Sequence, residues 1–278
     1  MMTLRAHGAV GSRAARLWSS ARFKFASAVV MVVAALVTPV LASSATTLNS
    51  SSPYSASGYD VSYPSAGCTA QPSGYSFAII GVGGGRPFTA NSCLATEWNY
   101  AKNKTSTQPS LYFNTGYAGA YSKSITTACA NASSNAPPTT GTRHDASVET
   151  QAWEIGCSEV DYAQSIAPNK PLMWWADVET GNSWSTQQTY NQYTIDGIAY
   201  ALAHIASSAI AGSSGGFYST VSSWNKIVGA GFASTPLVTA NWMPAASCPT
   251  TSGTGFSGGG SVWLAQQAST SYDVDTAC

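Results

Sequence analysis

Apolar and polar residues follow two different periods along this chain. From residue 58 onward, short apolar runs typical of strands alternate with longer stretches that place an apolar residue at every third or fourth position, as helices do. Helices are predicted over 93–102, 146–167 and 186–207, and strands over 58–62, 75–82, 110–114, 172–179, 216–220, 237–242, 262–267 and 272–275. Helices separate the early strands and short links join the last three. The pattern therefore predicts an α/β fold, a TIM-like barrel with an all-strand closing segment, over 58–278.

Three segments do not fit either period. Residues 43–57 are rich in Ser and Thr and predict a disordered leader, and 117–143, rich in Ala, Ser, Asn and Pro, predicts a long loop. The glycine-rich segment 81–85 lacks the G-K-[ST] ending of a phosphate loop, which favours a turn at the end of a strand.

The N-terminal 42 residues have the composition of a secretory signal peptide. Five basic residues and no acid precede an apolar run over 25–41 that ends in small residues. An uncleaved N-terminal anchor is the alternative. Cleavage leaves seven of the twelve basic residues against twelve acids, a net charge of −5. We therefore expect a secreted, extracellular monomer with no membrane span after processing and no affinity for nucleic acid, which needs clustered cations.

All six cysteines follow the leader, which predicts three disulfides in an oxidising compartment. Six cysteines allow 15 connectivities. Closeness in the sequence favours the pairs Cys68–Cys93, Cys129–Cys157 and Cys248–Cys278. No C-x-x-C motif is present, and only His144 and His204 follow the leader, so zinc sites and a Ser-His-Asp triad have little support. We expect no metal and no cofactor.

The acids divide between predicted helices and predicted strands. Solvent-facing helix positions account for Glu97, Asp145, Glu149, Glu154, Glu159, Asp161 and Asp196. The strand acids are Asp60, Asp177, Glu179, Asp273 and Asp275. Side chains alternate along a strand, so Trp175, Asp177 and Glu179 point the same way, and strands one and eight adjoin when a barrel closes. We expect the five strand acids to converge at one mouth of the barrel.

Convergent carboxylates raise one another's pKa, and that separates an acid from a base as glycosidic cleavage requires. We expect Glu179 to stay protonated while Asp177 and Asp60 stay ionised. Two other interpretations remain: the 177–179 acids cap the next helix, or the strand acids bind calcium and stabilise the barrel.

Short motifs in matching order resemble glycoside hydrolase family 25, the lysozyme-type muramidases with a flattened (β/α)5β3 barrel. They are 58–62, Asp177-Val178-Glu179, 217–220, 238–242, 263–267 and Val274-Asp275. The segments 91–94, 174–184 and 217–220 are similar to a group of largely uncharacterised secreted actinobacterial proteins at the edge of that family.

The resemblance implies that Glu179 is the general acid, that Asp177 orients or stabilises a 2-acetamido group and that Asp60 assists from the other side of the bond. Candidate substrate-binding residues are Asp275, Asp273, Trp175, Tyr218, Trp242, Asn114 and Gln266. Segments 80–85 and 112–115 depart from the family pattern. The expected function is hydrolysis of a cell-wall glycan such as peptidoglycan. The alternative is a catalytically silent barrel that binds glycan or associates with the wall.

Overall fold

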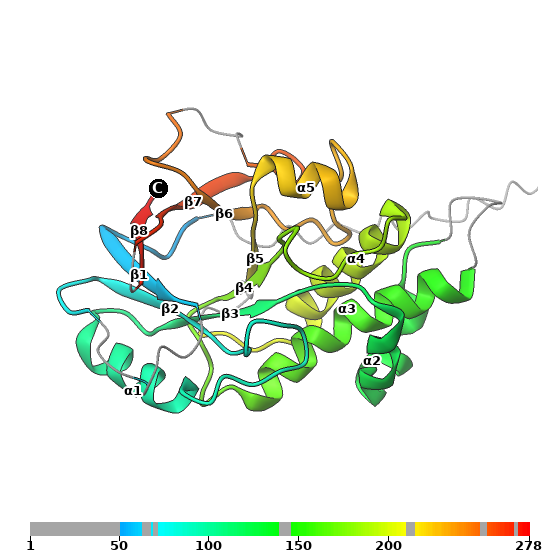
Figure 1. Ribbon diagram of the computed structural model, residues 1–278, viewed down its shortest axis with the longest axis horizontal. Helices are drawn as coiled ribbons and strands as arrows, with labels where there is room; N and C mark the ends of the chain where they lie inside the picture. The colour runs from blue at the N-terminus through cyan, green and yellow to red at the C-terminus, as the bar shows by residue number, and fades with distance from the viewer. Residues whose placement is uncertain are drawn as a thin grey trace, which may run out of the picture. The chain divides into compact units, whose positions relative to one another are not determined.

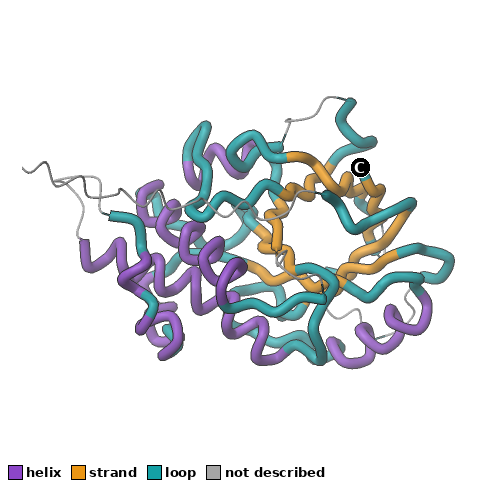
Figure 2. Tube along the Cα trace, turned by 180° about the vertical axis from the view of Figure 1, so that it is seen from behind, coloured by secondary structure: helices purple, strands orange, loops and turns teal. Residues whose placement is uncertain are grey.

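The strands of this protein close into one barrel in chain order. The computed structural model describes residues 51–62, 68, 72–138, 146–209, 215–250, 255–269 and 272–278. The barrel strands are β1 (Ser57–Val61), β2 (Phe77–Gly81), β3 (Ser110–Asn114), β4 (Trp174–Asp177), β5 (Gly215–Tyr218), β6 (Ala240–Pro244), β7 (Ser261–Gln267) and β8 (Asp273–Ala277). Figure 2 shows the strands as a ring seen down its opening.

Strand directions confirm the predicted α/β barrel with an all-strand closing segment. Neighbours from β1 to β7 pair in parallel, whereas β8 runs antiparallel to both β7 and β1. The helical segments are α1 (Leu94–Lys104), η1 (Gly119–Ser124), α2 (Thr127–Asn131), η2 (Ser133–Asn135), α3 (Ala146–Ile166), α4 (Gln188–His204) and α5 (Val221–Val228). Helices α1, α3 and α4 lie outside the ring on the side of β2 to β5 (Figure 1). In the described part of the chain, no helix separates β6, β7 and β8.

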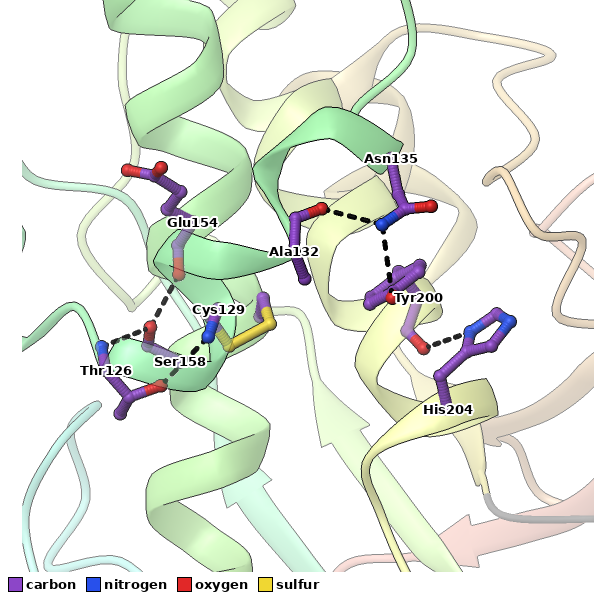
Figure 3. The surroundings of a disulfide bond; sticks show 9 residues. Thr126, Cys129, Ala132, Asn135, Glu154, Ser158, Tyr200 and His204 are labelled. Carbon is purple, nitrogen blue, oxygen red and sulfur yellow. Dashed lines mark hydrogen bonds between the residues drawn. A yellow bond between two sulfur atoms is a disulfide. The ribbon is translucent and has the colours of Figure 1, made fainter.

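The predicted loop over 117–143 is wrong where the structure describes it, since this segment folds into η1, α2 and η2. Thr126 caps α2 by accepting a hydrogen bond from the Cys129 backbone N–H, and its own N–H donates to Ser158 Oγ on α3 at 3.0 Å (Figure 3). The Cys129–Cys157 disulfide joins the same two helices. Short polar helices of this kind depend on a partner helix, so periodicity along the segment does not reveal them. Residues 139–145, with His144 and Asp145, lie outside the described residues.

Helix α5 was also not predicted from the sequence. Its Thr220 cap accepts a hydrogen bond from the Ser223 N–H at 2.9 Å, and Trp224, Ile227 and Val228 are buried along one side. Eight residues give only two turns of pattern, which is too short a stretch for helical periodicity to stand out.

Alternation along the strands divides the apolar side chains between two layers. On β4, Trp174 packs against Phe113 in the layer between the strands and the helices, and Trp175 points into the barrel, where it contacts Trp242. Tyr54 closes this inner layer: it is buried, and its hydroxyl bonds Ser110 Oγ at 2.6 Å and accepts the Trp175 indole N–H at 2.8 Å.

The position of Tyr54 corrects the predicted disordered leader. Residues 51–57 are ordered against the barrel, because Tyr54 finds partners that are distant in the sequence and so invisible to local composition. Residues 43–50 and the predicted signal peptide over 1–42 lie outside the described residues. No helix in the described part of the chain is long and apolar enough to cross a membrane.

The three predicted disulfides are confirmed. Cys68–Cys93, Cys129–Cys157 and Cys248–Cys278 have Cα–Cα distances of 5.3, 5.7 and 5.4 Å. Three such bonds indicate a protein that folds in an oxidising compartment, as extracellular proteins do.

Four of the helical acids that were expected at solvent-facing positions are instead buried: Glu97, Glu149, Glu159 and Asp196. Three of them hold other segments in place. Glu97 accepts the Asn91 amide N–H at 2.7 Å, Glu159 accepts the Gly116 backbone N–H at 3.0 Å, and Asp196 accepts the Thr235 backbone N–H at 2.6 Å. Burial raises the pKa of all three, that of Asp196 to about 8. The sides of the helices that carry these acids therefore face the protein interior and not solvent.

Candidate active site

One cavity of about 420 Å³ opens where the parallel strands end at their carboxyl termini. Ligand sites of α/β barrels lie at this end of the strands. The cavity is lined by Asp60, Ser62, Gly85, Tyr112, Asn114, Asp177, Glu179, Gly181, Asn182, Tyr218, Trp242, Gln266 and Asp273. None of these lining residues is Lys, Arg or His. The walls are therefore acidic and aromatic.

Asp177 ends β4 and lies in register with Asn114 on one side and Tyr218 on the other. Its Oδ2 accepts the Asn114 amide N–H at 2.6 Å. Asp177 Oδ1 and Asn114 Oδ1 are both buried and have no hydrogen-bond partner among the described residues. A buried acceptor without a partner is costly unless a ligand or water satisfies it. The Asp177–Asn114 pair thus has two oxygens free to bind a donor.

Glu179 follows Asp177 on the loop after β4 and is half-buried. Its carbonyl oxygen accepts the Asn182 backbone N–H at 3.1 Å and the Trp184 indole N–H at 2.8 Å. The Asn182 side chain reaches back to the Asp177 carbonyl oxygen at 3.3 Å. These bonds fix the backbone of the loop and leave the Glu179 carboxyl facing the cavity.

The opposite wall is a chain of hydrogen bonds that crosses the barrel from β5 to β1. The Tyr218 hydroxyl donates to Gln266 Oε1 at 2.7 Å, and Gln266 Nε2 donates to Asp60 Oδ2 at 2.8 Å. Behind Asp60, the Trp242 indole N–H donates to Asp275 Oδ1 at 2.8 Å. Because Tyr218 occupies the oxygen of the Gln266 amide, the nitrogen of that amide is directed at Asp60.

Burial is the largest cause of a raised pKa at each of these acids. It raises the pKa of Asp60 to about 7, with a further rise from Asp273 that hydrogen bonds to Gln266 and Asp275 oppose. The pKa of Asp177 lies well above its usual range because of burial and then the charge of Glu179, and burial raises the pKa of Glu179. The raised pKa is therefore not confined to Glu179, as the sequence led us to expect, but extends to Asp177 and Asp60. Both aspartates are buried, which disfavours their charged forms.

Eight predicted site residues line this cavity together: Asp60, Asp177, Glu179, Asp273, Asn114, Tyr218, Trp242 and Gln266. Asp275 lies behind Asp60 and is fully buried, and so is Trp175. The ring of Trp175 lies across Gly216, where a Cβ would come within 2.4 Å of it. Neither side chain lines the cavity, so the structure does not support the prediction that they bind substrate; both instead contact Trp242, which does line it.

Sequence reasoning missed Tyr112 and Asn182, which line the cavity as well. Tyr112 shares a side of β3 with Asn114, two residues on, so strand alternation could have found it. Asn182 is in a turn with no regular period and gave no comparable signal. Among the described residues, no group of three or more His, Cys, Asp or Glu could hold a metal ion.

Comparisons with known proteins do not assign a family or a function to this site. No protein-family model matches the chain, and no curated protein or solved structure does either.

Proposed function

We propose that this protein is a secreted glycoside hydrolase, of the family 25 type, that cleaves a cell-wall glycan such as peptidoglycan. The observation that carries the proposal is the placement of Asp60, Asp177 and Glu179, from β1 and the end of β4, in one cavity without a basic lining residue. Two or more carboxyl groups around one glycosidic bond are what its hydrolysis requires. The cavity volume of about 420 Å³ is that of an ordinary small-ligand pocket.

In this proposal Glu179 protonates the leaving oxygen of the glycosidic bond. Asp177 is buried, whereas Glu179 is only half-buried. The raised pKa of Glu179 keeps a proton available closer to neutral pH. Asp177 has a free Oδ1 for the 2-acetamido group of a cell-wall sugar, and its Oδ2 is held by Asn114. Asp60 lies on the opposite wall and assists from the other side of the glycosidic bond, and Gln266 orients its carboxyl group.

The aromatic walls suit a neutral sugar ring. Tyr112, Tyr218 and Trp242 line the cavity, and the last two pack with ring centroids 4.6 Å apart. Aromatic side chains offer an apolar face and a polar edge, which matches the two kinds of surface on a sugar.

The test is digestion of purified peptidoglycan and chitin oligomers, with chemical identification of the new reducing end. Glu179→Gln keeps the shape of the side chain and removes its proton, so turnover should fall by roughly a hundredfold or more. Glu154→Gln is the matched control: Glu154 lies on α3 beside the Cys129–Cys157 disulfide (Figure 3) and does not line the cavity, so its replacement should leave turnover unchanged.

The rival hypothesis is a silent barrel that binds glycan without cleaving it. It predicts retention of the protein on insoluble peptidoglycan and no new reducing ends from the wild type. Equal turnover by the wild type and Glu179→Gln would instead contradict the role given to Glu179.

A further inference from the structure

A second hollow, of about 370 Å³, lies beside the acidic cavity. It is lined by Thr180, Asn182, Trp184, Ser185, Thr186, Asn191, Lys226 and Ile227. Asn182 lines both spaces, so the turn after Glu179 is a shared wall between them. We refer to this second space as the side groove.

The side groove is preformed, because hydrogen bonds join the three segments that build it. The buried Asn191 on α4 donates to the carbonyl oxygens of Ser185 at 2.9 Å and Ile227 at 2.8 Å, and accepts the Ser185 backbone N–H at 2.9 Å. Gln188 donates to the carbonyl oxygen of Lys226 at 3.1 Å. Helix α5 is thereby fixed to α4 and to the segment after β4. A ligand would not have to order these walls on binding.

The lining of the side groove differs in charge from the acidic cavity. Lys226 is its single charged residue, and hydroxyl and amide groups from Thr180, Asn182 and Thr186 make up most of the rest. Trp184 adds an indole ring whose N–H is already bonded to the Glu179 carbonyl oxygen, which leaves the ring as an apolar wall. These groups suit a ligand that carries a carboxylate together with several peptide-like donors and acceptors.

We propose that the side groove binds an acidic peptide attached to the glycan strand, with a carboxylate of that peptide paired to Lys226. The inference rests on the proposed function, since the peptide arrives on the strand that occupies the acidic cavity. Asn182 lines both spaces, so a substituent on a sugar in the acidic cavity crosses the Asn182 turn to enter the groove that Lys226 lines. The protein would then prefer glycan strands that carry peptide stems to glycan strands without them.

The experiment compares two preparations of one peptidoglycan, one with its peptide stems and one stripped of them by an amidase. The wild type should cleave stem-bearing strands with a lower KM. Lys226→Gln should raise KM on stem-bearing strands by up to about fivefold, the upper limit for an exposed ion pair, with kcat little changed. Lys226→Arg should retain most of the preference. Lys170→Gln, an exposed lysine outside both spaces, is the matched control and should behave as the wild type does.

Each outcome decides something different. Equal KM values of the wild type on both preparations, or an equal rise on both in Lys226→Gln, would overturn the peptide site and leave the proposed hydrolysis intact. If neither preparation is cleaved, the proposed function fails, and calorimetric titration with a soluble acidic stem tetrapeptide decides the binding site by itself. Weaker binding to Lys226→Gln than to Lys170→Gln supports the site, and no binding to the wild type refutes it.

Discussion

Replacing Gln266 with leucine should raise the pKa of Asp60. In the wild type the Gln266 Nε2–H group donates to Asp60 Oδ2 at 2.8 Å, and this bond favours the ionised carboxylate. Leucine has a similar size and no donor. The variant should therefore hold the Asp60 proton to higher pH than the wild type, in which that pKa is already raised to about 7.

The expected size of this change follows from the burial of the bond. A hydrogen bond to a charged group contributes about 1.5–3 kcal/mol, and one pH unit of pKa corresponds to about 1.4 kcal/mol. Asp60 is 3 % exposed and Gln266 is 9 % exposed, so water cannot readily replace the lost donor. The pKa of Asp60 should rise by about one to two pH units.

The assay is a carbon-13 NMR titration of the aspartate carboxyl groups, with Asp60 assigned through Asp60→Asn. Gln267→Leu is the matched control: Gln267 is the next residue on β7, is exposed, and donates to the Ala246 carbonyl oxygen away from the cavity. Tyr218→Phe frees the Gln266 amide to rotate and should move the Asp60 titration in the same direction by less. An unmoved titration in Gln266→Leu, or an equal rise in Gln267→Leu, would refute this reasoning.

Local patterns in the sequence were enough to predict the barrel and its disulfides. Eight short apolar runs separated by helices or turns specify the strands, and the cysteine pairs lie 25 to 30 residues apart. The predictions that were wrong concern residues whose burial depends on partners distant in the sequence. Tyr54 lies in a Ser/Thr-rich segment, and its burial rests on Ser110 and on Trp175, 121 residues away. Glu159 is buried on α3, where its carboxyl group accepts the backbone N–H of Gly116 in the loop after β3, 43 residues away in the sequence.

The candidate site shows the same division. Strand alternation correctly placed Asp60 and Asp177 on the inner side of the barrel, because a period of two fixes the side to which each residue points. This period does not determine how deeply each side chain is buried. Trp175 and Asp177 share one row, yet only Asp177 reaches the cavity, and Trp242 and Gly216 enclose the ring of Trp175. Burial raises the pKa of a carboxyl group, so the raised pKa values of Asp60 and Asp177 follow from a depth that strand alternation does not reveal.

Three further predictions concern stability. Removing the 30-residue Cys248–Cys278 bridge with two serines should lower the free energy of unfolding by about 3–4 kcal/mol in the chain-entropy model; urea denaturation measures it, and an unchanged midpoint refutes it. Tyr54→Ala should cost about 3 kcal/mol by opening a cavity beneath Trp175, and Tyr54→Phe less, by the same measurement. Glu159→Gln should make stability less dependent on pH. Burial holds the Glu159 pKa well above 4.5 in the folded state, so the unfolded chain releases its proton first and stability falls as pH rises through the folded pKa. Glutamine keeps an acceptor for the Gly116 N–H and has no such proton to lose, so the decline between the unfolded and the folded pKa of Glu159 should shrink; a slope equal to that of the wild type would show that Glu159 does not retain its proton in the fold.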